Sequence, residues 1–250
     1  MDDKEAIKKA LNNVVDKHRE NIFRVFTGDL IENQLKTSVG HNYDVAISDP
    51  AVQKSDMIEI LTDTNKYLYG KEWNKLRINN KSNEFNNIRS VGVEGNHEYR
   101  TRKLAGQWIS TDMHEAAKVL DLKMQAIVEL TIVNKKLKKE TTYRMFIAHR
   151  LSKTNACSPE AILRGFIKKQ STLPGIDVII MGHTHNKFLS AGTYTDVKTG
   201  ETKKVLYVVN PSPMGAVEYA LEAGYPPLDS GFYQNIHLPL DPSIPIWGVV

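Results

Sequence analysis

The sequence predicts an α/β fold, because segments with helical spacing of apolar residues alternate with short apolar runs typical of strands. The chain has 250 residues, of which 41% are hydrophobic, so it is long enough to bury a full core. The run "IDVIIM" at 176–181 is continuous and apolar, as expected for a strand covered on both faces. No internal repeat or domain linker stands out, so we expect a single domain over residues 1–250.

Helical patterns mark the start of the chain and the region that follows residue 50. Ile7, Leu11 and Val14 recur at helical spacing, and acidic residues lead this segment, where the helix dipole favours them. Asp49 and Pro50 suit an N-cap and a first helical position. The elements expected up to residue 98 are a helix at 2–20, a strand ending at Gly28 and Asp29, a helix at 50–69, an exposed Asn- and Lys-rich insertion near 71–87, and a strand within "IRSVGVEGNHE".

The second half of the sequence predicts two hairpins and a buried strand. "QAIVELTIVN" and "TTYRMFIAH" frame a Lys-rich turn at 135–139, and "NKFLSAGTYTD" and "KKVLYVVN" frame a turn around "KTGE". The remaining expected elements are a short helix at about 112–121, a helix opened by Ser158 and Pro159 that runs to about Gln170, the "IDVIIM" strand and a last strand within 231–240.

Composition excludes several kinds of protein. Lys and Arg total 33 against 29 Asp and Glu, and the net charge of +4 would suit an anionic substrate but falls short of the dense basic stripe of a dedicated nucleic-acid binder, so charge alone does not decide between these classes. Cys157 is the single cysteine, so neither an intramolecular disulfide nor a thiolate metal cluster can form. No apolar run has the roughly 18 residues of a membrane span, and "MDDKEAIKKA" lacks the order of a signal peptide. We therefore expect a soluble, cytoplasmic protein without a membrane partner.

Polar side chains of the kinds that bind metals recur where the predicted strands end. Asp29 ends the first strand, His149 the third, and His183 the fourth. Open α/β sheets place their ligand crevice at the carboxyl ends of strands, so these side chains are expected to converge. Three further residues stand at the same kind of position: Asn96 and His97 after the second strand, and His185 two residues beyond His183.

Four short blocks resemble the calcineurin-like metallophosphoesterases. They are "GDLIEN" at 28–33, "GNHE" at 95–98, "FIAH" at 146–149 and "GHTH" at 182–185, in the order of the family and each after a strand. Each block alone is a weak signal, and together they span most of the chain. The longer stretches "GDLIENQLKTSVGHNY" and "GNHEYR" look most like the metallophosphoesterases carried by bacteriophages, which would place the protein in the host cytoplasm.

The resemblance implies a fold of two β-sheets sandwiched between helices, with two divalent transition-metal ions at the strand ends. In that family arrangement Asp29 would bridge both ions. Asn96, His149 and His183 would complete the coordination of one ion, and His185 would be a ligand of the other. His97 would hydrogen-bond the substrate or protonate the leaving group. Apart from the family pattern, Arg100 follows "GNHE" closely enough to bind the phosphate of the substrate.

The chemistry of these residue types agrees with the implied roles. A carboxylate has the two oxygens and the charge that a bridging ligand needs, Asn adds a neutral oxygen, and His adds a nitrogen. This mixed set suits Mn, Fe, Zn, Ni or Co better than Ca. Two ions about 3.5 to 4 Å apart can hold a phosphoryl group and activate a water. If the segment is extended, His183 and His185 face the same side and each can reach a different ion.

Two features depart from the family pattern. The family opens with a strand ending in Asp-x-His, which supplies two ligands, but only 27 residues precede Gly28 and none forms such a strand. Asp2 and Asp3 are poor substitutes, because they lead directly into a polar helix. We therefore expect the first strand to be missing, which leaves one nearly complete metal site and half of another. Arg150 also stands where the family usually has glycine after the histidine.

Structural roles are the alternative for each of these residues. Asp29 could belong to a simple Gly-Asp turn, Asn96 could cap a turn, and Arg100 could form a structural ion pair. His41, in the loop after "GDLIEN", could face the substrate or be a plain loop residue. Surface or packing roles are expected for His18, His114 and His237.

Three classes of function remain open on the sequence. The first is a metal-dependent phosphoester hydrolase acting on phosphodiesters, nucleic-acid ends among them. A protein Ser/Thr phosphatase is less favoured, because "LIEN" and "HRLS" stand where that branch of the family carries other residues. The second is a truncated or degenerate relative that binds metal without activity. The third is a nucleic-acid binding module without chemistry, which would bind in a salt-sensitive way without added metal.

Overall fold

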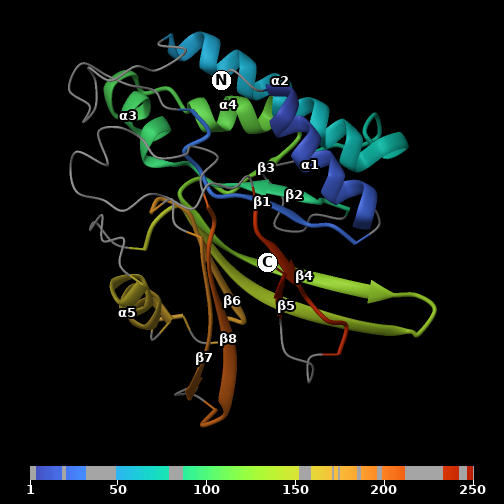
Figure 1. Ribbon diagram of the computed structural model, residues 1–250, viewed down its shortest axis with the longest axis vertical. Coiled ribbons are helices and arrows are strands. Elements are labelled where there is room, and N and C mark those ends of the chain that lie inside the picture. The colour runs from blue at the N-terminus through green and yellow to red at the C-terminus, as the bar shows by residue number, and fades with distance from the viewer. Residues whose placement is uncertain are drawn as a thin grey trace. The chain divides into compact units, whose positions relative to one another are not determined.

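The computed structural model describes residues 4–18, 21–31, 49–78, 87–151, 159–170, 172–173, 175–184, 187–195, 199–211, 233–241 and 247–249. The chain divides into two compact units, which we describe one at a time: unit 1 is 1–124 with 217–225, and unit 2 is 125–216 with 226–250. Figure 1 labels helices α1 to α5 and strands β1 to β8. The mixed α/β class is confirmed, whereas the two-sheet sandwich and the single domain stay predictions.

Unit 1 begins with two helices that confirm the sequence predictions. Helix α1 spans Lys4–His18 and helix α2 spans Pro50–Tyr69. Asp49 caps α2, because its carboxylate accepts a hydrogen bond of 2.8 Å from the backbone N–H of Ala51. Among the described residues before Gly28, no strand other than β1 (Arg24–Phe26) occurs, and Asp2 and Asp3 lie outside them.

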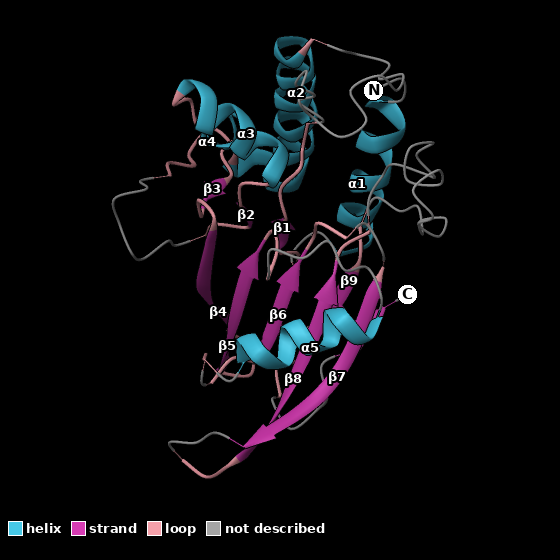
Figure 2. Cartoon of the chain, turned by 90° about the vertical axis from the view of Figure 1, so that its left-hand side faces the viewer, coloured by secondary structure: helices cyan, strands magenta, loops and turns pink. Residues whose placement is uncertain are grey.

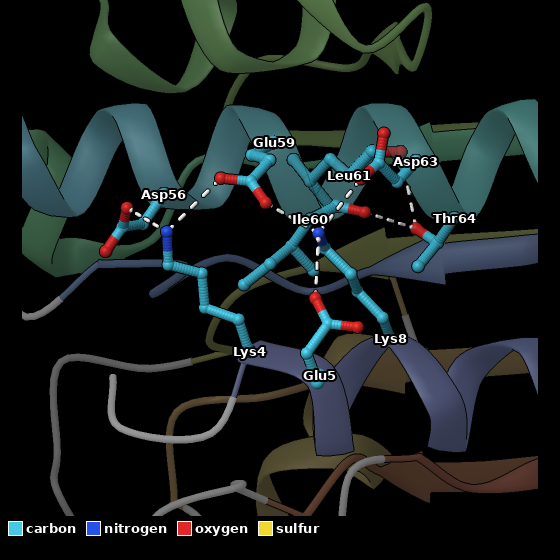
Figure 3. A network of polar contacts seen from close by, with 9 residues as sticks. All are labelled: Lys4, Glu5, Lys8, Asp56, Glu59, Ile60, Leu61, Asp63 and Thr64. Carbon is cyan, nitrogen blue, oxygen red and sulfur yellow. Dashed lines mark hydrogen bonds and ion pairs between the residues drawn. The ribbon is translucent and has the colours of Figure 1, made fainter.

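A network of ion pairs joins α1 to α2 (Figure 3). Lys4 Nζ lies 2.5 Å from Asp56, and Lys8 Nζ lies 2.6 Å from Glu59 and 2.9 Å from Asp63. Hydrogen bonds to Glu59 and then Asp63 raise the pKa of Lys8 above its usual range. The three acceptors follow one another along α2 at spacings of three and four residues and so lie on one face of the helix, which the two lysines of α1 bind.

The sheet of unit 1 is parallel, with the order β1-β2-β3. Strand β2 is Ser90–Gly92 and β3 is Leu120–Asp121. Helix α3 (Asn96–Ala105) and strand β3 were not expected, and the helix expected at 112–121 is α4, Ile109–Ala116. The core between the helices and the sheet is apolar and contains Ile31, Met57, Ile60, Leu61, Ile109, Met113, Ala117 and Val119.

The expected insertion near 71–87 is only partly described. A 3-10 turn, η1 (Gly70–Glu72), follows α2, and Leu76 is 8% exposed. Trp73 and Ile78 pack against the cluster that contains Leu76. Trp73, Leu76 and Ile78 therefore pack on the core of unit 1, while Lys71, Asn74 and Lys75 are exposed. Residues 79–86 lie outside the described residues, and the insertion stays a prediction.

Unit 2 contains a five-stranded sheet with the order β4-β5-β6-β8-β7. Both predicted hairpins are confirmed: β4 (Gln125–Asn134) pairs antiparallel with β5 (Lys139–Ala148), and β7 (Phe188–Thr195) with β8 (Thr202–Val209). Strand β6 (Val178–Met181) is buried along its whole length and runs parallel to β5 and β8. A separate antiparallel pair joins β9 (Asn235–His237) and β10 (Trp247–Val249).

Helix α5 (Pro159–Gln170) lies across one face of the five-stranded sheet, as Figure 2 shows. Its Phe166 is fully buried and stacks on Tyr207 of β8 with 4.9 Å between the ring centroids. Phe146 and Ile179 complete this core from β5 and β6. Among the described residues, no helix combines the length and the apolar character that a bilayer span requires.

Candidate functional site

Asp29 stands in the turn after β1 and faces the first turn of α3. Its backbone φ is 52°, and that of Gly28 is 84°, so both residues are left-handed. Asp29 Oδ1 accepts a hydrogen bond of 2.9 Å from the backbone N–H of His97, the second residue of α3. The amino end of a helix favours a nearby anion, so a carboxylate suits this position.

Two glycines let the turns after β1 and β2 come into contact. A Cβ on Gly28 would lie 2.5 Å from the backbone nitrogen of Gly95, and a Cβ on Gly95 would lie 2.0 Å from the backbone nitrogen of Asp29. No side chain fits at either position. The blocks "GD" and "GN" therefore have a steric reason for glycine, independent of any ligand.

Glu98 fixes this arrangement, although the sequence analysis gave it no role. It is fully buried, and its Oε2 accepts hydrogen bonds from the backbone N–H groups of Gly95 (3.0 Å) and Asp29 (3.1 Å). Its Oε1 accepts from Leu30 (2.5 Å) and Ile31 (3.3 Å). The available signal was its position: a Glu three residues after a helix N-cap commonly accepts from the cap backbone. We call Asp29, Asn96, His97 and Glu98 the Asp29 cluster.

The other predicted residues of unit 1 lie on α3. Asn96 is the first residue of the helix and Gly95 is its N-cap, so Asn96 is not the capping residue that the structural alternative supposed. His97 Nε2 lies 3.8 Å from Asp29 Oδ2, with 12% of each side chain exposed. Arg100 stands three residues after His97, which puts the two side chains on neighbouring positions of one helix face.

Unit 2 brings two predicted histidines together at the ends of neighbouring parallel strands. His149 directly follows β5 and is 4% exposed, and His183 follows β6 after Gly182. The backbone N–H of Gly182 donates to the carbonyl of His149 at 3.1 Å, which extends the pairing of the two strands beyond their ends. His149 Nε2 and His183 Nδ1 are 3.1 Å apart, with the rings at 74°. We call these two residues the histidine pair.

The backbone at His183 differs from the extended form assumed in the prediction for His185. His183 has a φ of 73°, so the backbone is not extended there and alternation along a strand does not fix where residue 185 points. His185 itself lies outside the described residues. Its role as a ligand stays a prediction.

The histidine pair fits a shared metal ion by distance. Two nitrogen ligands with metal–nitrogen bonds of about 2.0–2.1 Å stand about 2.9–3.4 Å apart when the nitrogen–metal–nitrogen angle lies between its octahedral and its tetrahedral value. The observed 3.1 Å lies in this range. A hydrogen bond between the two rings gives the same distance, and in that state one ring nitrogen carries the proton that a metal would displace.

His114 has the packing role expected for it. It is fully buried on α4, and its Nδ1 lies 3.0 Å from Asp121 Oδ1. Burial raises the pKa of Asp121, but hydrogen bonds from His114, Lys123 and Thr111 outweigh burial and hold that pKa well below its usual range. His18 ends α1 and His237 lies exposed in β9, while His41 is outside the described residues.

No protein-family model matches this chain, and no curated protein matches it. The resemblance to the metallophosphoesterases therefore depends on the four short blocks alone. The structure adds a physical reason for several of their residues: the two glycines permit contact, Glu98 fixes the Asp29 turn, and the strand ends bring His149 and His183 together.

Proposed function

We propose that the protein is a metal-dependent phosphoester hydrolase in which Asp29, Asn96, His149 and His183 hold a divalent transition-metal ion. The single observation that carries the proposal is the histidine pair, two imidazole nitrogens 3.1 Å apart at the ends of adjacent parallel strands. A charged carboxylate fixed at a helix start supports it from unit 1. The order of the four blocks along the sequence is the reason for assigning the two groups to one ion.

The donor set decides which ions are proposed. Nitrogen from two histidines with oxygen from Asp and Asn suits Mn, Fe, Zn, Ni or Co. A second ion would share Asp29 and use His185. When bound, such ions lower the pKa of water and neutralise charge on a phosphoryl group.

The residues of α3 would act on the substrate. His97 follows Asn96 directly, so its side chain is proposed to hydrogen-bond the phosphoryl group or to give a proton to the leaving oxygen. Arg100, on a neighbouring position of the same helix face, is proposed to bind a phosphate oxygen. Phosphodiesters, including the ends of nucleic acids, are the proposed substrates, and the net charge of +4 suits such anions.

Metal binding and hydrolysis test the proposal together. After dialysis against Mn or Zn, the chain should retain metal, a His183→Ala variant should lose it, and a His237→Ala variant should keep it, because His237 lies exposed in β9 of the same unit. Hydrolysis of bis-p-nitrophenyl phosphate should follow the metal content. Equal metal in all three proteins would overturn the proposal.

The same experiment separates the other classes of function. Firm metal binding without turnover indicates a relative that has lost activity. Salt-sensitive binding of DNA or RNA without added metal, together with no retained metal, indicates a nucleic-acid binding module.

A further inference from the structure

Strand β4 forms one edge of the five-stranded sheet of unit 2. No strand among the described residues pairs with its other edge. The strand is 10 residues long, contains no proline, and carries one charged residue, Glu129, which already pairs with Arg144 of β5 at 3.1 Å. Natural edge strands are usually blunted by charge, proline, a bulge or short length. Apart from that one charge, this edge lacks these protections: it has no proline, its ladder with β5 is continuous without a bulge, and it is long.

The apolar residues of β4 are arranged symmetrically about Leu130. Val128 and Ile132 stand two residues on either side of it, and Ile127 and Val133 stand three residues on either side. Ile127 is 43% exposed and Val133 is 58% exposed, although both are large and apolar. A sequence with this symmetry can pair with an identical strand that runs in the opposite direction.

We propose that a second copy of this chain pairs with the edge of β4, antiparallel and centred on Leu130. A two-fold axis perpendicular to the sheet keeps each side chain on its own face, so Ile127 stands opposite Val133 of the second copy and Val128 opposite its Ile132. Glu129 then stands opposite Thr131 of the second copy. The two sheets become one continuous sheet of ten strands.

The neighbouring registers are less favourable. A shift in one direction centres the pairing on Glu129 and places two carboxylates directly opposite each other, which is destabilising. A shift in the other direction centres it on Thr131 and sets Glu129 against Val133. Of these three registers, only the one centred on Leu130 gives every apolar residue from 127 to 133 an apolar or uncharged partner and also keeps the two Glu129 carboxylates apart. It also forms roughly eight to ten backbone hydrogen bonds.

The molar mass of the full chain is the first test. Light scattering after size-exclusion chromatography should give twice the 28.3 kDa of one chain at micromolar concentration. A mass of one chain throughout the concentration series would overturn the proposal.

A pair of charge variants tests the edge and the register. Both variants carry Val133→Lys, which places a lysine opposite Glu140 within the hairpin. They differ only in the residue placed at position 127. Combined with Ile127→Glu, Val133→Lys gives two ion pairs across the proposed interface and should keep the dimer. Combined with Ile127→Lys, it gives like charges and should produce monomers. A dimer retained by both variants, or lost by both, contradicts this pairing.

Cross-linking fixes the centre of symmetry directly. The variants are made in a Cys157→Ser background. Leu130→Cys then places the cysteines of the two copies directly opposite each other, within the reach of a disulfide. Val128→Cys places them four residues apart along the strands, about 13 Å, which no disulfide spans. Efficient cross-linking at 130 and not at 128 supports the proposal. Cross-linking at 128, or at neither position, overturns it.

Discussion

The Asp29 cluster and the histidine pair are built in opposite ways. In the Asp29 cluster, one buried side chain, Glu98, accepts four backbone hydrogen bonds and so holds the turns after β1 and β2. In the histidine pair, the residues follow two strands that are already held in a ladder, and only backbone groups set their spacing. The first arrangement depends on particular side chains, and the second depends on the sheet.

This difference distinguishes residues proposed to bind the metal, the ligands, from residues that hold the backbone around a ligand, the supports. Removing a support in the Asp29 cluster should unfold the turn that carries the ligand, so stability and metal binding should fall together. Removing a ligand from the histidine pair should lower metal binding alone, because the ladder between β5 and β6 does not need the imidazoles. The following predictions are ordered from the largest expected effect on stability to the smallest.

Gly95→Ala should have the largest effect on stability. The new Cβ would stand 2.0 Å from the backbone nitrogen of Asp29 and 2.6 Å from Glu98 Oε2, so backbone must move. Overpacking of this kind costs about 1–3 kcal/mol and sometimes more. Thermal unfolding should show it, with Gly165→Ala in α5 as the control, because no atom lies near its added Cβ. Equal Tm values for the two variants would show that the contact between the turns is not needed.

Glu98→Gln should destabilise the chain by about 1–3 kcal/mol in urea unfolding, because one of its two acceptor oxygens becomes a donor that faces backbone N–H groups. Metal retention should fall with stability, since the Asp29 turn loses its support. Glu129→Gln, an exposed change in unit 2, is the control. Lost stability with unchanged metal binding would mean that Glu98 does not position Asp29 for a metal.

Asp121 should make unit 1 sensitive to acid. Its pKa in the folded chain lies below its unfolded value, so its contribution to stability is present above about pH 4 and is lost as the pH falls further. Urea unfolding between pH 3 and pH 7 should show a decline that is smaller in Asp121→Asn, a variant that is less stable at pH 7. A parent and variant with parallel pH profiles would contradict this assignment.

His149→Ala should lower metal retention while changing Tm less than Glu98→Gln does. The β5–β6 ladder and the Gly182 hydrogen bond to the carbonyl of residue 149 do not involve the imidazole. Circular dichroism and elemental analysis of the same sample measure both properties. A Tm as low as that of Glu98→Gln would remove the distinction between the two clusters.

The ion pairs between α1 and α2 should contribute least. Lys8 binds Glu59 and Asp63, but those carboxylates are about half exposed to solvent. Lys8→Met should therefore lower Tm only slightly, and the difference from the parent should shrink in 1 M NaCl, where exposed charges are screened. A large loss of Tm that persists in high salt would point to packing by the lysine stem instead.

Periodicity predicted the long elements well. Helices α1, α2 and α5 and both hairpins begin or end within a few residues of the expected positions, because each has a strong apolar pattern or a cap such as Asp49. Helix α3 was missed because "NHEYRTRKLA" is strongly polar and has no apolar stripe. Strand β3 was missed because two residues give no pattern, and their pairing depends on β2.

The candidate site was predicted in part. Residue types at strand ends indicated Asp29 and the two histidines, and the structure confirms that His149 and His183 are neighbours. The role of Glu98 could not be read from apolar patterns, because it comes from hydrogen bonds to a turn nearly 70 residues earlier. The assumption of an extended backbone at His183 also failed, because this residue is left-handed and alternation along a strand does not hold there.

A double-mutant cycle on metal affinity tests most directly whether the Asp29 cluster and the histidine pair share one ion. Zn or Mn affinity is measured for the parent, Asp29→Asn, His183→Ala and the double variant. If both residues bind the same ion, each single change lowers affinity by about tenfold or more, and the double variant loses much less than the product of the two losses. Independent losses that multiply, or a single variant with the affinity of the parent, would contradict the shared ion and with it the proposed function.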